Sequence, residues 1–268
     1  MSTTTDNPAR TFFGTELRRR RDEAGLTGKQ LADSLGCTPQ WISVMEGGKK
    51  ISEQSAHDLD TYFKTGGLFH RLWKLANDIE LQTTLPPGFP EYAEREKRAN
   101  SIRVYSAILL TGLFQTEDYA HTVMTSTDGP HSADLVDKRM ERKAILTRDK
   151  APHVWLTVDE TILRRTVGSP EVMRKQLAFL LEVSELPNVM VDVVPQSVGY
   201  YAGLGGSFNL LGFEDGTSSA YTESAGVGML IEQPNKVALF RIRYDLLRGH
   251  ALPVRESRAL IQAVLEEL

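Results

Sequence analysis

Cysteine is nearly absent from this 268-residue chain, and long apolar runs are absent altogether. The single cysteine, Cys37, excludes an internal disulfide framework, suits a reducing compartment, and is better explained as a small buried hydrophobe than as a redox switch. No stretch approaches the roughly 20 apolar residues of a membrane-spanning helix, and the opening MSTTTDNPART lacks the apolar core of a secretion signal. We therefore expect a cytoplasmic protein that does not contact a membrane.

Motifs for catalysis and cofactor binding are also missing. No G-x-S-x-G, Walker or G-x-G-x-x-G pattern occurs, and the glycine-rich GYYAGLGGSF precedes a predicted strand, so it lacks the helix N-terminus that binds phosphate. Asp159 and Glu160 stand together at a predicted strand end, but Glu160 is better explained as the start of a short helix. The histidines are scattered without metal-ligand spacing, at His57, His70, His121, His131, His153 and His250. The sequence predicts no enzyme activity, no cofactor and no metal site.

Residues 27–50 hold a pattern typical of two short helices joined by a tight turn. Thr27 is followed three residues later by Gln30, the spacing of a capping box that begins a helix, and Gly36 ends that helix. Thr38 caps the next helix and Pro39 occupies its first position, where a missing N–H costs nothing. The apolar positions that face between the helices are Leu31, Ala32, Leu35, Ile42 and Met45. Such a pair suits a second helix placed in the DNA major groove.

The motifs L-A-x-x-L-G, T-x-Q-x-I-S and M-E-x-G-K, within residues 10–75, resemble the XRE-type (lambda-repressor or Cro-like) helix-turn-helix regulators. The resemblance implies an all-α bundle of about five helices that binds double-stranded DNA. Gly28 and Pro39 stand where relatives often carry a polar contact residue, which predicts fewer direct base contacts. By position, the resemblance implies a DNA-contacting set of Arg18, Arg21, Lys29, Gln30, Thr38, Pro39, Gln40, Trp41, Ser43, Val44, Lys49 and Lys50.

Gln40 is the strongest candidate for reading a base, because its amide can form two hydrogen bonds with adenine. Lys49 and Lys50 follow the second helix and would neutralise phosphates, which positions the protein without specifying a sequence. About two of the four consecutive arginines at 18–21 can face DNA, since neighbouring positions on a helix point in different directions. The alternatives are that Trp41 only packs against the rest of the domain and that Gln40 is only a solvent-exposed residue of its helix.

The net charge of the chain is small. The whole chain carries a net charge of −4, but residues 1–75 hold 11 Lys or Arg against 9 Asp or Glu, which is +2 and leaves −6 for the remainder. A strongly basic nonspecific binder is excluded. A weakly positive face on an acidic protein instead favours a homodimer on a specific site, which predicts an inverted-repeat operator.

The run LQTTLPPGFPEY separates two halves of different character. Its three prolines and one glycine within five residues predict a semi-rigid break in regular structure. We expect a disordered tail over residues 1–9, the DNA-binding domain over 10–84, a Pro-rich linker over 85–90 and a second domain over 91–268.

The second domain shows mixed α and β patterning. HVWLTVDE alternates apolar and polar residues as a strand does, and VMVDVVP, SFNLLGF, SSAYTE and GMLIE are further strand candidates. Helices are predicted over 132–149, 236–249 and 254–268, and others open at Glu117 and at Ser169-Pro170. We therefore expect an α+β domain with a mostly antiparallel sheet.

The segments LTGLFQTEDYA, DKRMERKAILTRD, VDETILRRTVGSPEVMRKQL and PNVMVDVVP occur in the same order in a second known group. They resemble the uncharacterised C-terminal domain of XRE-type regulators abundant in actinomycetes, commonly encoded beside a small acidic protein and described as antitoxin-like. Thr111-Gly112 departs from the Pro-Gly usual in that family. The resemblance implies a transcriptional regulator that receives a signal from a small protein or a ligand. The alternative is an antitoxin that mainly sequesters its partner, with DNA binding serving autoregulation.

One loop of the second domain is a candidate surface for a ligand or a partner. The residues are Tyr200, Tyr201, Gly203 and Gly205, together with Glu223 from a nearby strand. Adjacent tyrosines beside glycines offer aromatic surface on a mobile backbone. The alternative is that the tyrosines pack over the sheet.

Overall fold

The computed structural model describes residues 7–125 and 132–268 of the chain. The chain divides into two compact units, Met1–Thr84 and Leu85–Leu268. None of the helices in the described ranges is long and apolar enough to cross a bilayer.

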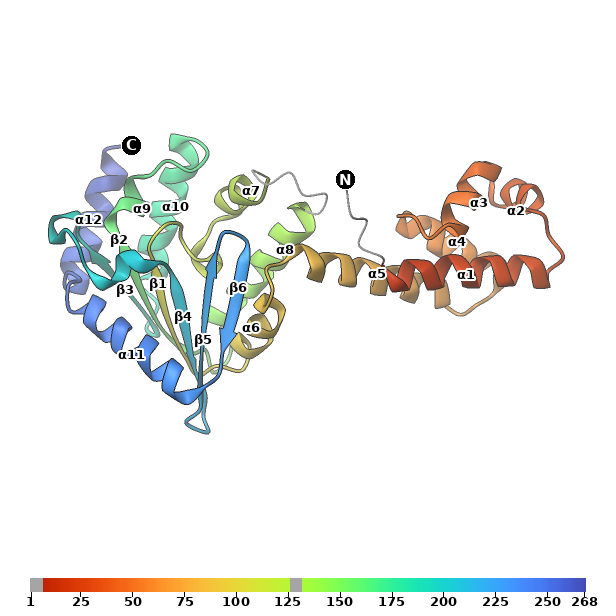
Figure 1. Cartoon of the computed structure of the whole chain (residues 1–268). Helices are drawn as coiled ribbons and strands as arrows, with labels where there is room; N and C mark the ends of the chain where they lie inside the picture. The colour runs from red at the N-terminus through yellow and green to blue at the C-terminus, as the bar shows by residue number, and fades with distance from the viewer. Residues whose placement is uncertain (1–6, 126–131) are drawn as a thin grey trace. The chain divides into compact units, whose positions relative to one another are not determined.

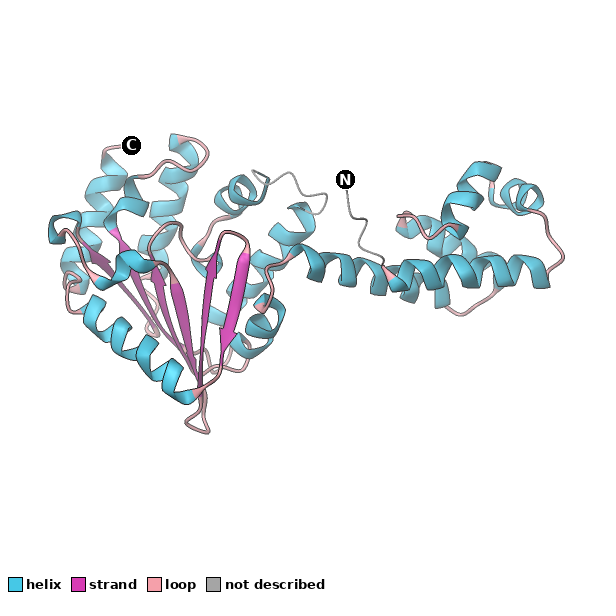
Figure 2. Ribbon diagram, viewed as in Figure 1, coloured by secondary structure: helices cyan, strands magenta, loops and turns pink. Residues whose placement is uncertain are grey.

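The first unit is built from helices (Figure 2). They are α1 (Pro8–Glu23), α2 (Gly28–Leu35), α3 (Pro39–Glu46), α4 (Glu53–Phe63) and α5 (Leu68–Thr84). The first four begin at polar caps whose side chains accept backbone N–H groups, namely Asn7, Thr27, Thr38 and Ser52. Their apolar faces enclose one core that includes Phe13, Leu17, Leu31, Ile42, Met45, Leu59 and Phe69. The predicted bundle of about five helices is confirmed.

Two boundaries differ from the sequence-based expectation. Helix α1 begins at Pro8, inside the expected tail, because Asn7 caps it and Ala9 is buried. Helix α6 (Phe89–Glu96) begins inside the expected linker. Pro90 lies in its first turn, where no N–H is needed, so this proline is compatible with helix.

The second unit holds a six-stranded sheet of order β3-β2-β1-β4-β5-β6 (Figure 1). The strands are β1 (Ser101–Ser106), β2 (His153–Asp159), β3 (Val189–Val194), β4 (Phe208–Gly212), β5 (Ser218–Ser224) and β6 (Val227–Ile231). The β1–β2 and β2–β3 pairs are parallel, whereas β1–β4, β4–β5 and β5–β6 are antiparallel. The α+β fold with a mostly antiparallel sheet is thus confirmed.

The helices of this unit cover both faces of the sheet. After α6 they are α7 (Glu117–Thr125), α8 (Ser132–Arg142), α9 (Glu160–Arg164), α10 (Pro170–Val183), α11 (Pro234–Arg248) and α12 (Val254–Glu266). The helix predicted over 132–149 ends at Arg142 and continues as a 3₁₀ turn, η2 (Lys143–Leu146). Another 3₁₀ turn, η1 (Gly112–Phe114), follows β1.

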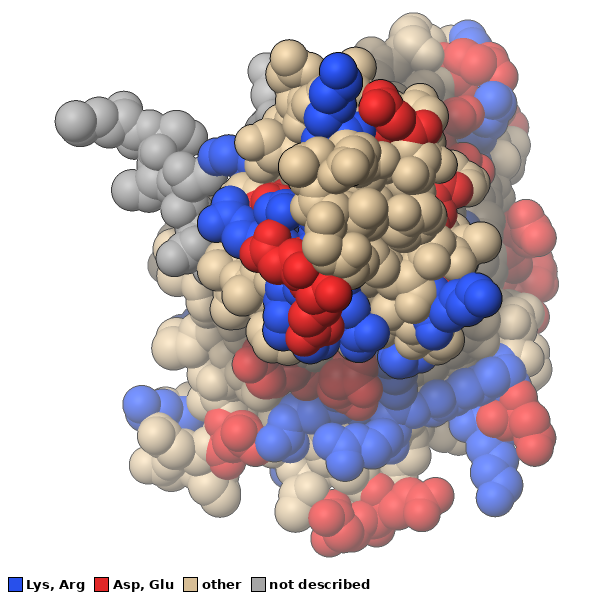
Figure 3. Space-filling view, turned by 90° about the vertical axis from the view of Figure 1, so that its right-hand side faces the viewer, with Lys and Arg blue, Asp and Glu red and all other residues tan. Residues whose placement is uncertain are grey.

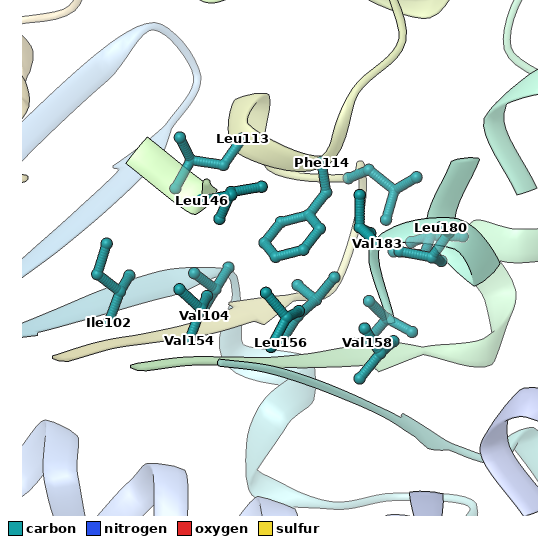
Figure 4. Packing of buried hydrophobic residues seen from close by; sticks show 14 of the residues in the cluster. Ile102, Val104, Leu113, Phe114, Leu146, Val154, Leu156, Val158, Leu180 and Val183 are labelled. Carbon is teal, nitrogen blue, oxygen red and sulfur yellow. The ribbon is translucent and has the colours of Figure 1, made fainter. Parts of the chain in front are cut away.

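Alternation along the strands divides the buried side chains between the two faces. On β1, Ile102 and Val104 join the larger core, whereas Tyr105 joins the smaller one beneath α11. Phe114 of η1 reaches into the larger core above the strands, near Val104 and Leu156 (Figure 4). The sheet is therefore buried on both sides, and its strand ends are left to form sites.

Candidate nucleic-acid interface

The capped helix pair forms as the sequence predicted. Thr27 Oγ1 accepts the backbone N–H of Gln30, and the Gln30 side chain accepts the backbone N–H of Thr27 at 2.8 Å. Gly36 ends α2 with a φ of +66°, a left-handed conformation that glycine adopts without strain. Thr38 caps α3 and Pro39 occupies its first turn. The turn between the helices is thus fixed by its own side chains.

The first turn of α3 presents polar groups to solvent. Ile42 and Met45 are 1% and 2% exposed and hold the inner face of the helix in the core. The opposite face is exposed at Thr38, Pro39, Gln40 and Ser43, and Val44 is half-buried at its edge. This arrangement leaves Gln40 available to a base edge.

Two candidate contacts also perform structural work in the absence of DNA. Trp41 is half-buried against the helical core, and its Nε1 lies 3.3 Å from Ser55 Oγ as a hydrogen-bond donor. Gln30 places its Oε1 in the capping box, although its side chain is exposed. Nearby Cys37 is half-buried, and burial raises the pKa of its thiol, which disfavours a reactive thiolate.

Two arginines of the predicted DNA-contacting set, Arg21 and Arg18, pair with a carboxylate at the end of α3. Arg21 donates to both carboxylate oxygens of Glu46 at 2.5 and 3.1 Å, and its side chain is only 15% exposed. Arg18 also donates to Glu46, at 3.2 Å, from a more exposed position. Both arginines therefore bind α1 to the end of α3. The sequence gives no sign of this because Glu46 lies 25 residues beyond Arg21.

The other two arginines are also neutralised. Arg19 pairs with Glu16 and Glu23, and Arg20 pairs with Glu16. On the helical unit, nearest the viewer in Figure 3, blue and red side chains interleave around an uncharged area instead of forming one basic surface. Exposed lysines remain at Lys29, Lys49 and Lys50, with Lys50 4.0 Å from Glu80.

The ion pairs of Glu46 with Arg21 and Arg18 predict that the stability of the helical unit depends on pH. Burial alone would raise the pKa of Glu46, but hydrogen bonds from Arg21 and Arg18 outweigh it and lower the pKa below 4.5. A lowered folded-state pKa contributes stability above the unfolded-state value that is lost as the pH falls through the folded-state value. Glu46→Gln should therefore lower the free energy of unfolding by about 1–2 kcal/mol at neutral pH. This value lies between the contributions of exposed and of buried ion pairs.

Chemical denaturation of both proteins between pH 7 and pH 3 tests this expectation. The difference between wild type and variant should shrink as the pH falls below 4.5. A difference that stays constant over the acid range would show that the Glu46 charge does not stabilise the unit.

A glycine that sequence reasoning missed brings α1 against α3. A Cβ at Gly14 would lie 2.4 Å from the Glu46 carbonyl oxygen and 2.9 Å from that of Met45. Only glycine permits this approach, because neither backbone atom can move independently of α3. Its position on the buried side of α1, in TFFGTELR, was the available signal.

In the second unit, the glycine-rich loop is anchored rather than open. Tyr201 is 4% exposed, and its hydroxyl donates to Asp159 Oδ2 and meets the Tyr105 hydroxyl, each at 2.6 Å. A Cβ at Gly203 would lie 2.3 Å from the Tyr201 ring, so that glycine also serves packing. Tyr201 and Gly203 are therefore buried, as the packing alternative expected, because the hydroxyl network draws the tyrosine inward.

The remaining members of that set are accessible. Tyr200 is 89% exposed. Gly205 and Glu223 line one pocket of about 370 Å³ at the end of β1. Tyr200 is not among the residues of that pocket, so the five predicted residues do not form one site.

One group of side chains could hold a metal ion, which the spacing of the histidines alone did not reveal. Ligand atoms of Glu53, His57 and His70 lie within 4.8 Å of one another. Glu53 and His57 are one turn apart on α4, and His70 comes from α5. The imidazoles stack at 4.3 Å, and His70 Nε2 already lies 2.9 Å from Glu53 Oε1, which accounts for the cluster without an ion.

Two family models match the chain. Residues 13–69 match one described as Helix-turn-helix domain, and residues 89–263 match one described as Domain of unknown function (DUF5753). No curated protein and no solved structure matches it. The first match, together with the capped helices and exposed α3 turn, makes the protein a DNA-binding regulator. Because the second match spans more than half of the sequence, the chain belongs to the DUF5753 family, with a helix-turn-helix domain before it.

Proposed function

We propose that the protein is a cytoplasmic, sequence-specific transcriptional regulator of the XRE type that binds an inverted-repeat operator as a homodimer. In this proposal the first turn of α3 enters the major groove. Gln40 reads a base there, and Lys29, Lys49 and Lys50 contact phosphates. The observation that carries the proposal is the exposed polar turn of α3 on a helix pair fixed by its own caps.

Charge supports two copies on one duplex. The arginines of α1 are paired with carboxylates, so one helical unit offers few cations to the phosphate backbone. Affinity for DNA rises with the number of phosphates neutralised. Two units on half-sites about one helical turn apart double that number and impose the symmetry of an inverted repeat.

Footprinting on the protein's own promoter tests the proposal directly. We expect protection of an inverted repeat, and its complete absence would overturn the operator-binding role. If a small acidic protein encoded nearby binds residues 91–268 without changing the footprint, the antitoxin alternative replaces signal reception.

Two substitutions test the docking of α3. Gln40→Ala should weaken operator binding by about 1–3 kcal/mol and relax specificity at one base pair. Lys49→Ala should weaken binding to all sequences alike and lower the salt slope by about one. Binding isotherms over a range of salt concentrations measure both effects.

Gln262→Ala, at an exposed glutamine on α12, is the matched control and should leave operator affinity unchanged. If Gln40→Ala and Lys49→Ala change specificity and salt dependence in the same way, the docking of α3 is wrong.

A further inference from the structure

A pocket of about 370 Å³ opens where the sheet changes from parallel to antiparallel pairing. It lies at the carboxyl end of β1, which has parallel β2 on one side and antiparallel β4 on the other. Chain connections diverge at such a point, which leaves room for ligands in α/β sheets. Segments from α6, α8 and the loop after β1 complete the walls.

Two arginines of α8 line this pocket, and one of them is neutralised. Arg142 donates to Glu96 Oε2 through Nε at 3.0 Å and through Nη2 at 2.7 Å. Glu96 is 2% exposed and also accepts the Tyr92 hydroxyl at 2.5 Å, and Arg142 lies over the Phe89 ring. This arginine is fully engaged in the structure of the unit.

Arg139, one turn earlier on α8, lacks such a partner. Its Nη1 donates to the neutral Gln115 Oε1 at 2.7 Å, and among the described residues no carboxylate forms an ion pair with it. Burial, together with the charge of Arg142, lowers the pKa of Arg139 to about 10, and the charge of Glu223 opposes this shift. Gly112 makes room for it, since a Cβ there would lie 3.1 Å from Arg139 Nε.

The walls around Arg139 combine apolar side chains with polar ones such as Gln115, Asn209 and Thr222. Phe89, Leu110, Val123 and Phe208 supply apolar lining, and so do the more exposed Ile108 and Leu109. Backbone at Gly205 and Gly206 borders it without side chains. A concave pocket that offers both apolar surface and a few convergent polar groups is typical of a small-molecule site.

We propose that this pocket binds a small organic carboxylate whose apolar or aromatic body fills the cavity and whose carboxylate pairs with Arg139. The guanidinium fork matches a planar carboxylate, and a half-buried cation without a counter-charge is costly until an anion arrives. One unpaired arginine in a pocket that Glu223 also lines suits a single negative charge better than the charge of a phosphate group. The role of this ligand as the regulator's signal rests on the proposed function. The existence of the binding site does not rest on it.

The test is calorimetric titration of the full chain with benzoate, phenylacetate, 3-phenylpropionate and hexanoate. Benzyl alcohol and inorganic phosphate serve as comparison compounds. We expect saturable binding of at least one carboxylate at millimolar concentration or below, with the neutral alcohol and phosphate weaker. Failure of every carboxylate to bind the folded chain, or tighter binding of phosphate, would overturn the proposal.

Two variants assign the binding to the pocket. Arg139→Gln should raise the dissociation constant by about ten- to a hundredfold, because it removes a charge-assisted hydrogen bond. Arg95→Gln, which removes an arginine paired with Glu232 outside the pocket, should leave the constant unchanged. Equal affinity of wild type and Arg139→Gln would exclude this site.

A thermal measurement separates ligand binding from structural support. Without ligand, Arg139→Gln should leave the melting temperature of the second unit unchanged or raised, because an unpaired charge is removed. A lowered melting temperature with unchanged carboxylate affinity would make Arg139 a structural residue. If carboxylate binds but the operator footprint is unaffected, the site stands and its role as the regulatory signal is wrong.

Discussion

Gly14→Ala is expected to destabilise the helical unit by about 3 kcal/mol, at the upper end for overpacking. Helix propensity alone predicts the opposite sign, since alanine in a helix interior is favoured over glycine by about 1 kcal/mol. Contact decides the outcome, because the new methyl group would meet the Glu46 carbonyl oxygen at 2.4 Å. The end of α3 must then move away from α1, so operator binding should fall as well.

Urea denaturation followed by helical circular dichroism measures the stability change, and titration of operator DNA measures the affinity. Gly28→Ala is the matched control, since a Cβ there meets only Ile42 Cγ2, at 4.0 Å. That variant should fold with unchanged or slightly increased stability. Equal behaviour of the two variants would show that α1 and α3 do not approach as closely as described.

Phe114→Ala is expected to destabilise the second unit by about 3–5 kcal/mol, the range for deleting a buried aromatic side chain. Phe114 is fully buried and lies among Val104, Leu156 and Val183, from β1, β2 and α10 (Figure 4). Gln176 holds the same turn in place by donating to the Phe114 carbonyl at 2.7 Å. The cavity cannot close easily because strands and helix are fixed independently.

Differential scanning calorimetry should show a lowered transition for the second unit of Phe114→Ala. Leu239→Ala, on the outer face of α11 where Leu239 is 66% exposed, should leave that transition unchanged. A loss of similar size in both variants would contradict a special role for the turn after β1.

Local rules were sufficient for the helix-turn-helix. The caps at Thr27, Thr38 and Ser52 and the left-handed Gly36 each depend on a few neighbouring residues, so the sequence specifies them directly. The patterns of strands β2 to β6 are also local, but β1 was not among the predicted strands. The linker was predicted to extend through Pro90, but a proline is permitted in the first turn of a helix. The sequence pattern alone therefore did not show where α6 begins.

The candidate sites were harder to predict, because they depend on residues distant in sequence. Arg21 looked available to DNA until Glu46 was found beside it. Tyr201 looked like surface until Asp159 and Tyr105 were found to hold it inward. Arg139 drew no attention, since its lack of a counter-charge emerges only when α8 is placed against the loop after β1.

The pairing of β1 has a consequence for the order in which the chain folds during synthesis. Every element of the helical unit is available once residue 84 has left the ribosome, so it can form early. Strand β1 must wait for β2, and then for β4, because Tyr105 pairs with Phe208 about a hundred residues later. The helical unit can therefore be complete while β1, with the apolar side chains of Ile102 and Val104, is still unpaired.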